Sequence, residues 1–120
     1  MIIYTVHDGS LTLDGVLIGR GYSGQPQCKN DPAKCSAKDE GPIPPGSYTI
    51  GEPVDTATHG PFVLPLTPHP DNEMYGRSGF LIHGDSIKAP GTASHGCIVV
   101  SRTVRELVHE CGERTLVVEA

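Results

Sequence analysis

Residues 1–18 read MIIYTVHDGSLTLDGVLI, three short apolar runs separated by two Asp-Gly pairs. Asp-Gly is typical of tight β-hairpin turns, because both residue types tolerate a positive φ. Residues 11–13 alternate apolar and polar side chains, as a strand with one buried face does. We therefore predict that the chain begins with an antiparallel β-meander over residues 1–6, 11–13 and 16–18.

The rest of the chain is rich in turns. Its 120 residues include 15 glycines and 11 prolines, which favour short strands over long elements. Apolar runs predict further strands at residues 47–50, 62–66, 80–83, 97–100 and 115–118. Pro65 cannot donate a hydrogen bond to a neighbouring strand, so we expect residues 62–66 to lie at a sheet edge or strand end.

One helix is expected, over residues 102–111. Its apolar positions repeat with the spacing i, i+3, i+4, i+7 and are Val104, Leu107, Val108 and Cys111. We predict that Cys111 is buried on this face, that Thr103 and Glu106 form a capping box, and that Gly112 ends the helix. The pattern indicates one mainly β domain, residues 1–120, with a single helix near the C-terminus packed on it.

The charge and hydropathy of the chain exclude some classes of partner. Its net charge of −5 comes without a basic cluster, which disfavours nucleic acid as a partner. No run approaches the roughly 18 apolar residues of a membrane span. Residues 1–6 are too short for the apolar part of a signal peptide. We therefore expect a protein made in the cytoplasm without a signal peptide and, if exported, carried by a route that reads none.

The strongest chemical signal is Ser94-His95-Gly96-Cys97, with His83 upstream at the end of an apolar run. A thiol becomes a nucleophile when a nearby imidazole accepts its proton. His83 arrives from another strand and is the better candidate base. His95 would face the thiol only if residues 95–97 were extended. We expect the Gly96 and Cys97 amides to bind an oxyanion, and Ser94 to bond an imidazole or the loop backbone.

Two other interpretations of these residues stay open. In one, Cys97 and His83 are ordinary buried residues at strand ends. In the other, His83, Asp85, His95 and Cys97 supply ligands to Zn²⁺, although their spacing matches no established zinc signature. The remaining histidines have no comparable neighbours, and we expect them on the surface or in loops: His7, His59, His69 and His109.

Cys28 and Cys35 lie in one polar loop, separated by six residues. A disulfide between them would close the loop and stabilise it, provided that the protein works in an oxidising compartment. The alternative is a pair of exposed thiols. The sequence does not decide between the two.

Residues 94–98, SHGCI, preceded by the pair His83-Gly84, are similar to the signature of YkuD-type L,D-transpeptidases. The stretches 11–15, 41–48 and 74–85 resemble more particularly the short L,D-transpeptidase-like effectors of type VI secretion systems. The resemblance implies a small β-sandwich or barrel and a cysteine enzyme without a cofactor or metal. It assigns Cys97 as nucleophile and His83 as base, and it leaves Ser94, His95, Gly84 and Asp85 to shape the site.

The implied substrate is the tetrapeptide stem of peptidoglycan, and the implied reaction is L,D-carboxypeptidase cleavage or D-amino-acid exchange. The spacer between His83 and Ser94 is shorter than in housekeeping L,D-transpeptidases, and Val99 replaces their usual Asn or Arg. Both departures favour a trimmed groove. Arg77 or Arg102 would then bind a substrate carboxylate.

The resemblance also implies an antibacterial toxin that a secretion machine delivers into the periplasm of a target cell. Such a toxin needs a delivery component and a cognate immunity protein in the producing cell. Two alternatives from other classes remain. One is a zinc-dependent peptidase that uses His83, Asp85 and His95, and the other is a non-catalytic module that binds the cell wall.

Overall fold

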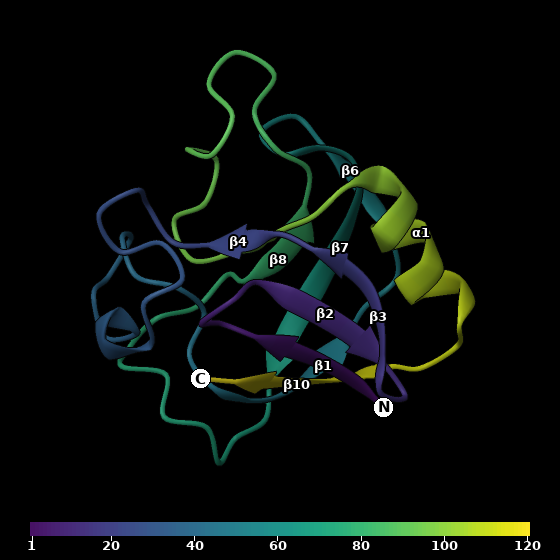
Figure 1. The fold of residues 1–120 in the computed structure, drawn as a ribbon, viewed down its shortest axis with the longest axis horizontal. Helices are drawn as coiled ribbons and strands as arrows, with labels where there is room; N and C mark the ends of the chain where they lie inside the picture. The colour runs from purple at the N-terminus through teal and green to yellow at the C-terminus, as the bar shows by residue number, and fades with distance from the viewer.

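The computed structural model describes residues 1–120 and contains the predicted N-terminal meander (Figure 1). β1 (Ile2–Thr5), β2 (Ser10–Leu13) and β3 (Val16–Arg20) are consecutive antiparallel strands. Gly9 and Gly15 adopt φ values of 71° and 84° in the two turns, the conformation for which Asp-Gly is favoured.

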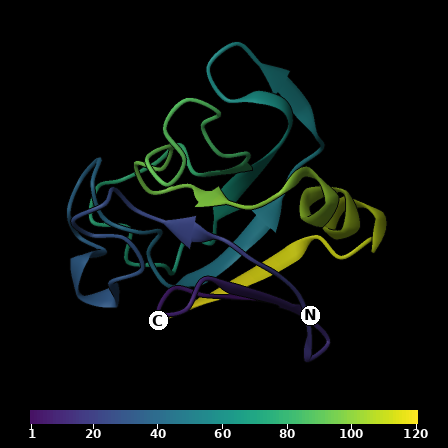
Figure 2. The same ribbon diagram turned by 45° about the horizontal axis from the view of Figure 1, so that its top comes forward.

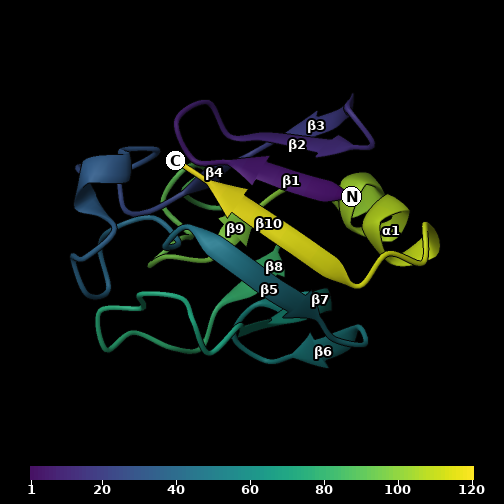
Figure 3. The ribbon, with the colours of Figure 1, turned by 90° about the horizontal axis from the view of Figure 1, so that it is seen from below.

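All ten strands belong to one sheet that curls into a nearly closed barrel (Figure 3). Its order is β3–β2–β1–β10–β5–β7–β8–β9–β4, and β6 pairs with β7 beside this path. The remaining strands are β4 (Tyr22–Ser23), β5 (Gly46–Ile50), β6 (Val54–Thr56), β7 (Gly60–Pro68), β8 (Leu81–His83), β9 (Ile98–Val99) and β10 (Thr115–Glu119). The expected mainly β barrel with one helix is confirmed.

The first and last strands of the chain are neighbours in the middle of this sheet. β10 runs parallel to β1, with Ile2 opposite Leu116, and antiparallel to β5 on its other side. The barrel interior holds one cluster of 17 buried apolar residues, contributed by most strands and by the helix. Burial of this cluster is the main stabilising contribution to the fold.

The prediction that Pro65 confines its strand to an edge is wrong. β7 is internal and pairs with β5, β6 and β8. The N–H groups of Leu64 and Leu66 face β8, so the nitrogen of Pro65 faces the opposite side. There β5 ends at Ile50 and the chain turns at Gly51, whose N–H donates to the Pro65 carbonyl (2.8 Å). Pro65 therefore lies between the segments of β7 that pair with β5 and with β6, and its missing N–H removes no hydrogen bond between strands.

α1 (Arg102–Glu110) packs against β7 and β8, and no helix is long and apolar enough to span a membrane. The predicted capping box is wrong, because the N-cap is Ser101, whose hydroxyl accepts from the Val104 N–H. Gly112 ends the helix as predicted, with a φ of 79°. Cys111 is exposed rather than buried, since it is the C-cap and lies beyond the face that packs on the sheet.

The buried face of α1 consists of Val104, Arg105 and Val108, while Leu107 is 44% exposed. A charged residue, Arg105, thus lies on the buried face of the helix, at a position that is not part of the apolar repeat. The polar loop of residues 24–45 lies on the far side of the barrel from α1 (Figures 1 and 2). It contains the short 3₁₀ helix Pro32–Lys34, capped by Asp31.

Candidate active site

The parallel strands β8 and β9 position the two residues with the strongest chemical signal. Ile82 lies opposite Ile98, and both side chains are fully buried in the core. His83 lies opposite Val99, and Cys97 directly precedes β9. Because side chains alternate between the faces of a strand, His83 and Cys97 share the face opposite the two isoleucines.

His83 is 2% exposed, and one of its ring nitrogens is held by the backbone. Nδ1 lies 2.8 Å from the Gly84 carbonyl oxygen, which only accepts, so Nδ1 carries the proton and donates it. Nε2 is buried and has no hydrogen-bond partner. Burial lowers the pKa of His83 below its ordinary value of 6.5, and the nearby His59 and Arg105 act in the same direction. His83 is therefore a neutral imidazole with its lone pair free at Nε2.

The Cys97 thiol makes no hydrogen bond to this imidazole. Its Sγ lies 4.0 Å from the Gly79 carbonyl oxygen. Burial raises the pKa of Cys97 above its ordinary value, although a backbone hydrogen bond from Leu81 and the charge of Arg77 oppose the shift. The thiol is consequently protonated at neutral pH in this state of the molecule.

Ser94 organises the loop before Cys97. Its fully buried hydroxyl accepts from the N–H groups of Gly24 (2.9 Å) and Gly96 (3.1 Å) and donates to the Cys97 carbonyl. Of the two roles considered for Ser94, the loop-backbone role is the observed one. The Gly96 N–H already donates to the Ser94 hydroxyl, so it does not fit the expected role in binding an oxyanion. Of the two amides expected in that role, the Cys97 amide remains.

His95 makes its side-chain contacts with the polar loop of residues 24–45. Its ring contacts the side-chain nitrogen of Gln25 (3.1 Å) and the Asp39 carbonyl oxygen (3.0 Å), both in the polar loop of residues 24–45. Residues 95–97 are not extended, because Gly96 has a φ of 138°. His95 thus joins the Ser94–Cys97 loop to the polar loop of residues 24–45, and its role in shaping the site stays a prediction.

Two adjoining clefts open beside His83. The larger, of about 550 Å³, is lined by three histidines, His59, His83 and His95, together with Arg105. The smaller, of about 410 Å³, is lined mainly by Tyr22, the 99–102 segment and three arginines, Arg20, Arg102 and Arg105. Gly84, Asp85 and Arg105 belong to both clefts. Cys97 lines neither of them.

A family model for the Tlde1 domain matches residues 18–118, which include β8, β9 and the whole Ser94–Cys97 loop. The chain belongs to the Tlde1 domain family. This is a family of type VI secretion effectors, and membership implies delivery by a secretion system and a cognate immunity protein. No curated protein matches the chain.

Arg77 has a structural position in this Tlde1 domain. It is 6% exposed, and its two terminal nitrogens donate to four carbonyl oxygens, those of Cys35, Gly41, Pro42 and His95. The guanidinium thereby ties the loop of residues 24–45 to the Ser94–Cys97 loop. The role predicted for Arg77 in binding a substrate carboxylate does not fit these contacts.

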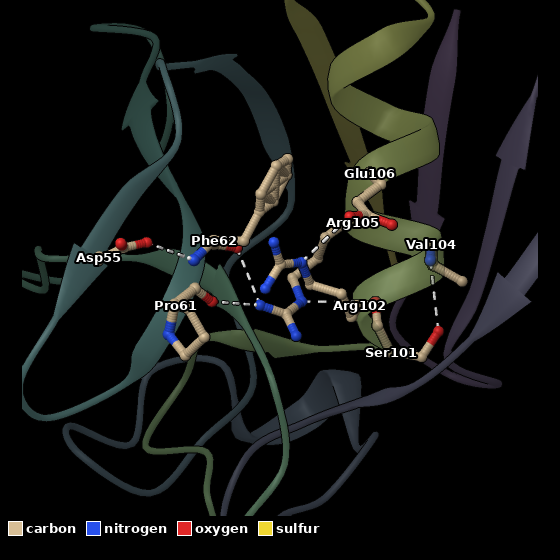
Figure 4. Close-up of polar contacts among 8 residues, drawn as sticks. All are labelled: Asp55, Pro61, Phe62, Ser101, Arg102, Val104, Arg105 and Glu106. Carbon is tan, nitrogen blue, oxygen red and sulfur yellow. Dashed lines mark hydrogen bonds and ion pairs between the residues drawn. The ribbon is translucent and has the colours of Figure 1, made fainter.

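Arg102 lies at the rim of the smaller cleft. Its Nε pairs with Glu106 one turn later on α1 (3.3 Å), and its guanidinium stacks over the Phe62 ring at 4.8 Å (Figure 4). It does not line the larger cleft that contains His83. Binding of a substrate carboxylate by Arg102 stays a prediction, and it would have to occur in the smaller cleft.

The residues of the zinc alternative do not converge in the Tlde1 domain. Asp85 accepts hydrogen bonds from the Tyr22 hydroxyl (2.6 Å) and from the N–H groups of Ser86 and Gly91. No group of three histidine, cysteine or carboxylate side chains is arranged to hold a metal ion. Asp85 instead closes the loop that follows β8, and Gly84 joins this loop to His83.

His59 was missed by the sequence reasoning, which placed it with the surface histidines. Its ring packs against that of His83, and it lines the larger cleft. The pair His59-Gly60 repeats the His-Gly pattern of His83-Gly84 and is the only signal in the sequence that singles it out. Arg105 was also missed, because it occupies an ordinary helix position.

Cys28 and Cys35 are free thiols in the structure, and both are buried. The alternative of two exposed thiols is therefore wrong, because the two thiols are free but buried. Both belong to the loop of residues 24–45 that Arg77 anchors. A disulfide between them stays a prediction for an oxidising compartment.

Proposed function

We propose that this Tlde1 domain is a cysteine acyl-transferase that cleaves the tetrapeptide stems of peptidoglycan. Cys97 is the nucleophile and His83 is the base. The observation that carries the proposal is the unpaired, buried Nε2 of His83 on the strand face that it shares with Cys97. An imidazole held as the correct tautomer by a backbone carbonyl is what a general base requires.

The first half-reaction forms a thioester. Sγ of Cys97 attacks the carbonyl carbon between diaminopimelate and the terminal D-Ala, and its proton passes to Nε2 of His83. The carbonyl electrons move to the oxygen, where the Cys97 amide stabilises the negative charge. The carbon–nitrogen bond then breaks, the imidazolium returns the proton to the departing amine, and D-Ala leaves.

The second half-reaction decides the product. Water attacks the thioester with His83 as base, and the shortened stem is released while the proton returns to Sγ. A free D-amino acid in place of water gives exchange instead. The thiol lies 4.0 Å from the Gly79 carbonyl oxygen, so the proposed reaction requires the thiol to turn towards His83. Catalytic hydrogen bonds are often absent or long before substrate binds.

The test is release of D-Ala from purified tetrapeptide muropeptides, with and without a free D-amino acid, followed by mass spectrometry. We expect Cys97→Ala and His83→Gln to lose activity by roughly a thousandfold or more. Cys111→Ala is the matched control, because it removes an exposed thiol far from β8 and β9. Retained release by Cys97→Ala would exclude the thiol mechanism.

The same variants test the biological role when the protein is directed to the periplasm of a susceptible bacterium. We expect growth inhibition by the wild type and none by Cys97→Ala. If Cys97→Ala still inhibits growth and the wild type releases no D-Ala, the domain is instead a non-catalytic module that binds the wall.

A further inference from the structure

Two arginines of the barrel are buried, and neither has a carboxylate partner. Arg77 and Arg105 are each 6% exposed, and the ion pairs of the protein include neither. A buried charge without a counter-ion is costly unless hydrogen bonds replace its lost hydration. Arg77 meets this requirement, because both of its terminal nitrogens donate to carbonyl oxygens.

Arg105 meets it only in part (Figure 4). Its Nη1 donates to the carbonyl oxygens of Pro61 and Phe62, both at 2.9 Å, and its Nε donates weakly to the Ser101 carbonyl at 3.4 Å. Its Nη2 has no acceptor in the protein. One edge of this guanidinium thus anchors the start of β7, and the other is left free.

The free nitrogen faces the site. A Cβ added to Gly84 would lie 2.9 Å from Nη2, so the guanidinium lies close against the backbone of residue 84. Gly84 directly follows His83, and its carbonyl oxygen accepts the hydrogen bond from His83 Nδ1. Arg105 lines both clefts. An anion bound at Nη2 would therefore lie where the two clefts join, one residue from the proposed base.

No acidic side chain of the protein occupies this position. Asp85 shares both clefts but is bonded to Tyr22, Ser86 and Gly91, and Glu106 pairs with Arg102. Burial, followed by the nearby charge of Arg102, lowers the pKa of Arg105, but a guanidinium stays charged throughout the neutral range. The Arg105 guanidinium therefore presents to the cleft a positive charge that forms no ion pair.

We propose that Arg105 determines specificity by binding a carboxylate of the stem peptide through Nη2. The inference rests on the proposed function and names the substrate group that positions the scissile bond. Two carboxylates flank that bond, the terminal one of D-Ala and the one on the side chain of diaminopimelate. Either has the charge and acceptor geometry that an arginine N–H binds.

The test compares three tetrapeptides: one with both carboxylates free, one with D-Ala amidated, and one with diaminopimelate amidated. For the wild type we expect kcat/KM to fall about 10- to 100-fold when the recognised carboxylate is amidated, and little when the other one is. The amide that causes the loss identifies the carboxylate that is bound. For Arg105→Gln we expect a similar fall on the free peptide, chiefly through KM, and no further loss on amidation.

Arg105→Gln also removes the anchor of Pro61 and Phe62, so its ratio of kcat/KM between substrates is the decisive quantity. A purely structural role would lower the turnover of all three peptides together and leave that ratio unchanged. Arg105→Lys should restore part of the preference, since it keeps the charge. Arg114→Gln is the matched control, because Arg114 donates only to the backbone carbonyls of His109 and Glu113 and lines neither cleft.

Two results would overturn the inference: equal turnover of the three peptides by the wild type, or an unchanged preference in Arg105→Gln. If the wild type releases no D-Ala at all, the proposed function fails. Calorimetric binding of the same peptides to Cys97→Ala and to Cys97→Ala with Arg105→Gln then decides the carboxylate site by itself. Affinity that does not depend on Arg105 would refute it.

Discussion

The ring of His59 lies against the ring of His83, with centroids 4.6 Å apart and planes inclined by 48°. His59 is in the turn between β6 and β7, and its N–H donates to Thr56 Oγ1 (2.8 Å), which fixes the turn. His83 ends β8, so the contact joins two separate parts of the sheet. A residue outside the recognisable motif thereby covers the proposed base and adds to the low pKa of His83.

Replacing His59 with alanine should uncover His83. Since burial and the neighbouring His59 both lower the pKa of His83, we expect this pKa to rise towards 6.5 in His59→Ala. Titration of the imidazole signals by NMR measures the shift directly. His69→Ala is the control, because His69 is exposed and pairs with Asp71 in another loop. An unchanged His83 pKa would show that the ring contact contributes nothing.

In the wild type, the loss of activity at low pH should follow the protonation of His83. His83 must be neutral to accept the Cys97 proton, and its pKa is lowered from 6.5 by burial. Activity should therefore persist at pH 6.5 and be lost only as the pH falls below that value. The measurement is kcat/KM for D-Ala release as a function of pH. A limb centred at or above 6.5 would contradict a buried neutral base.

Gly96 should resist substitution for reasons of packing. It has a φ of 138°, and an added Cβ would lie 2.5 Å from Arg77 Nη2 and 2.9 Å from the Phe80 ring. We expect Gly96→Ala to lower the free energy of unfolding by about 2–4 kcal/mol in urea denaturation. Gly76→Ala is the control, because Gly76 has a φ of 72° but no atom within 4 Å of the added Cβ. Its cost should be about 1–2 kcal/mol, the penalty for a side chain in the left-handed region. Equal costs would show that the clash is relieved without penalty.

Oxidation should join Cys28 to Cys35. Intact-mass measurement after incubation in an oxidising glutathione buffer should show the loss of two thiol hydrogens, which the Cys28→Ser and Cys35→Ser variants do not undergo. The bond should stabilise the oxidised protein by about 2–3 kcal/mol. Cys111→Ser is the control and should still lose both hydrogens. Failure to form the bond would mean that the loop holds the two sulfurs apart.

Local patterns predicted much of the fold. The Asp-Gly turns placed β1 to β3 correctly, because hairpins are set by neighbouring residues. Apolar runs located β8 and the strand after Cys97, although β9 proper begins at Ile98. The internal position of β7 was not predictable from Pro65, since it depends on where two other strands end.

Only part of the candidate site could be predicted from the sequence, because the rest depends on residues that are distant in the chain. His83 and Cys97 stand in a recognisable motif, but no hydrogen bond joins their side chains in the structure. His59 and Arg105 come from a turn and a helix that meet His83 only through the curl of the sheet. The structural role of Arg77 could not be predicted from the sequence. Its buried position depends on four carbonyl oxygens that come from two loops distant in the sequence.

The central position of β10 has a consequence for how a cell makes this toxin. Without β10, the sheet would divide into β3–β2–β1 on one side and the strands from β5 to β4 on the other. The strand that joins them follows the other nine strands in the sequence and contains Leu116 and Val118, both buried in the core. A ribosome-bound chain that stops before β10 therefore cannot close the barrel. Folding of the domain, and any activity that depends on it, would begin only after synthesis has passed β10.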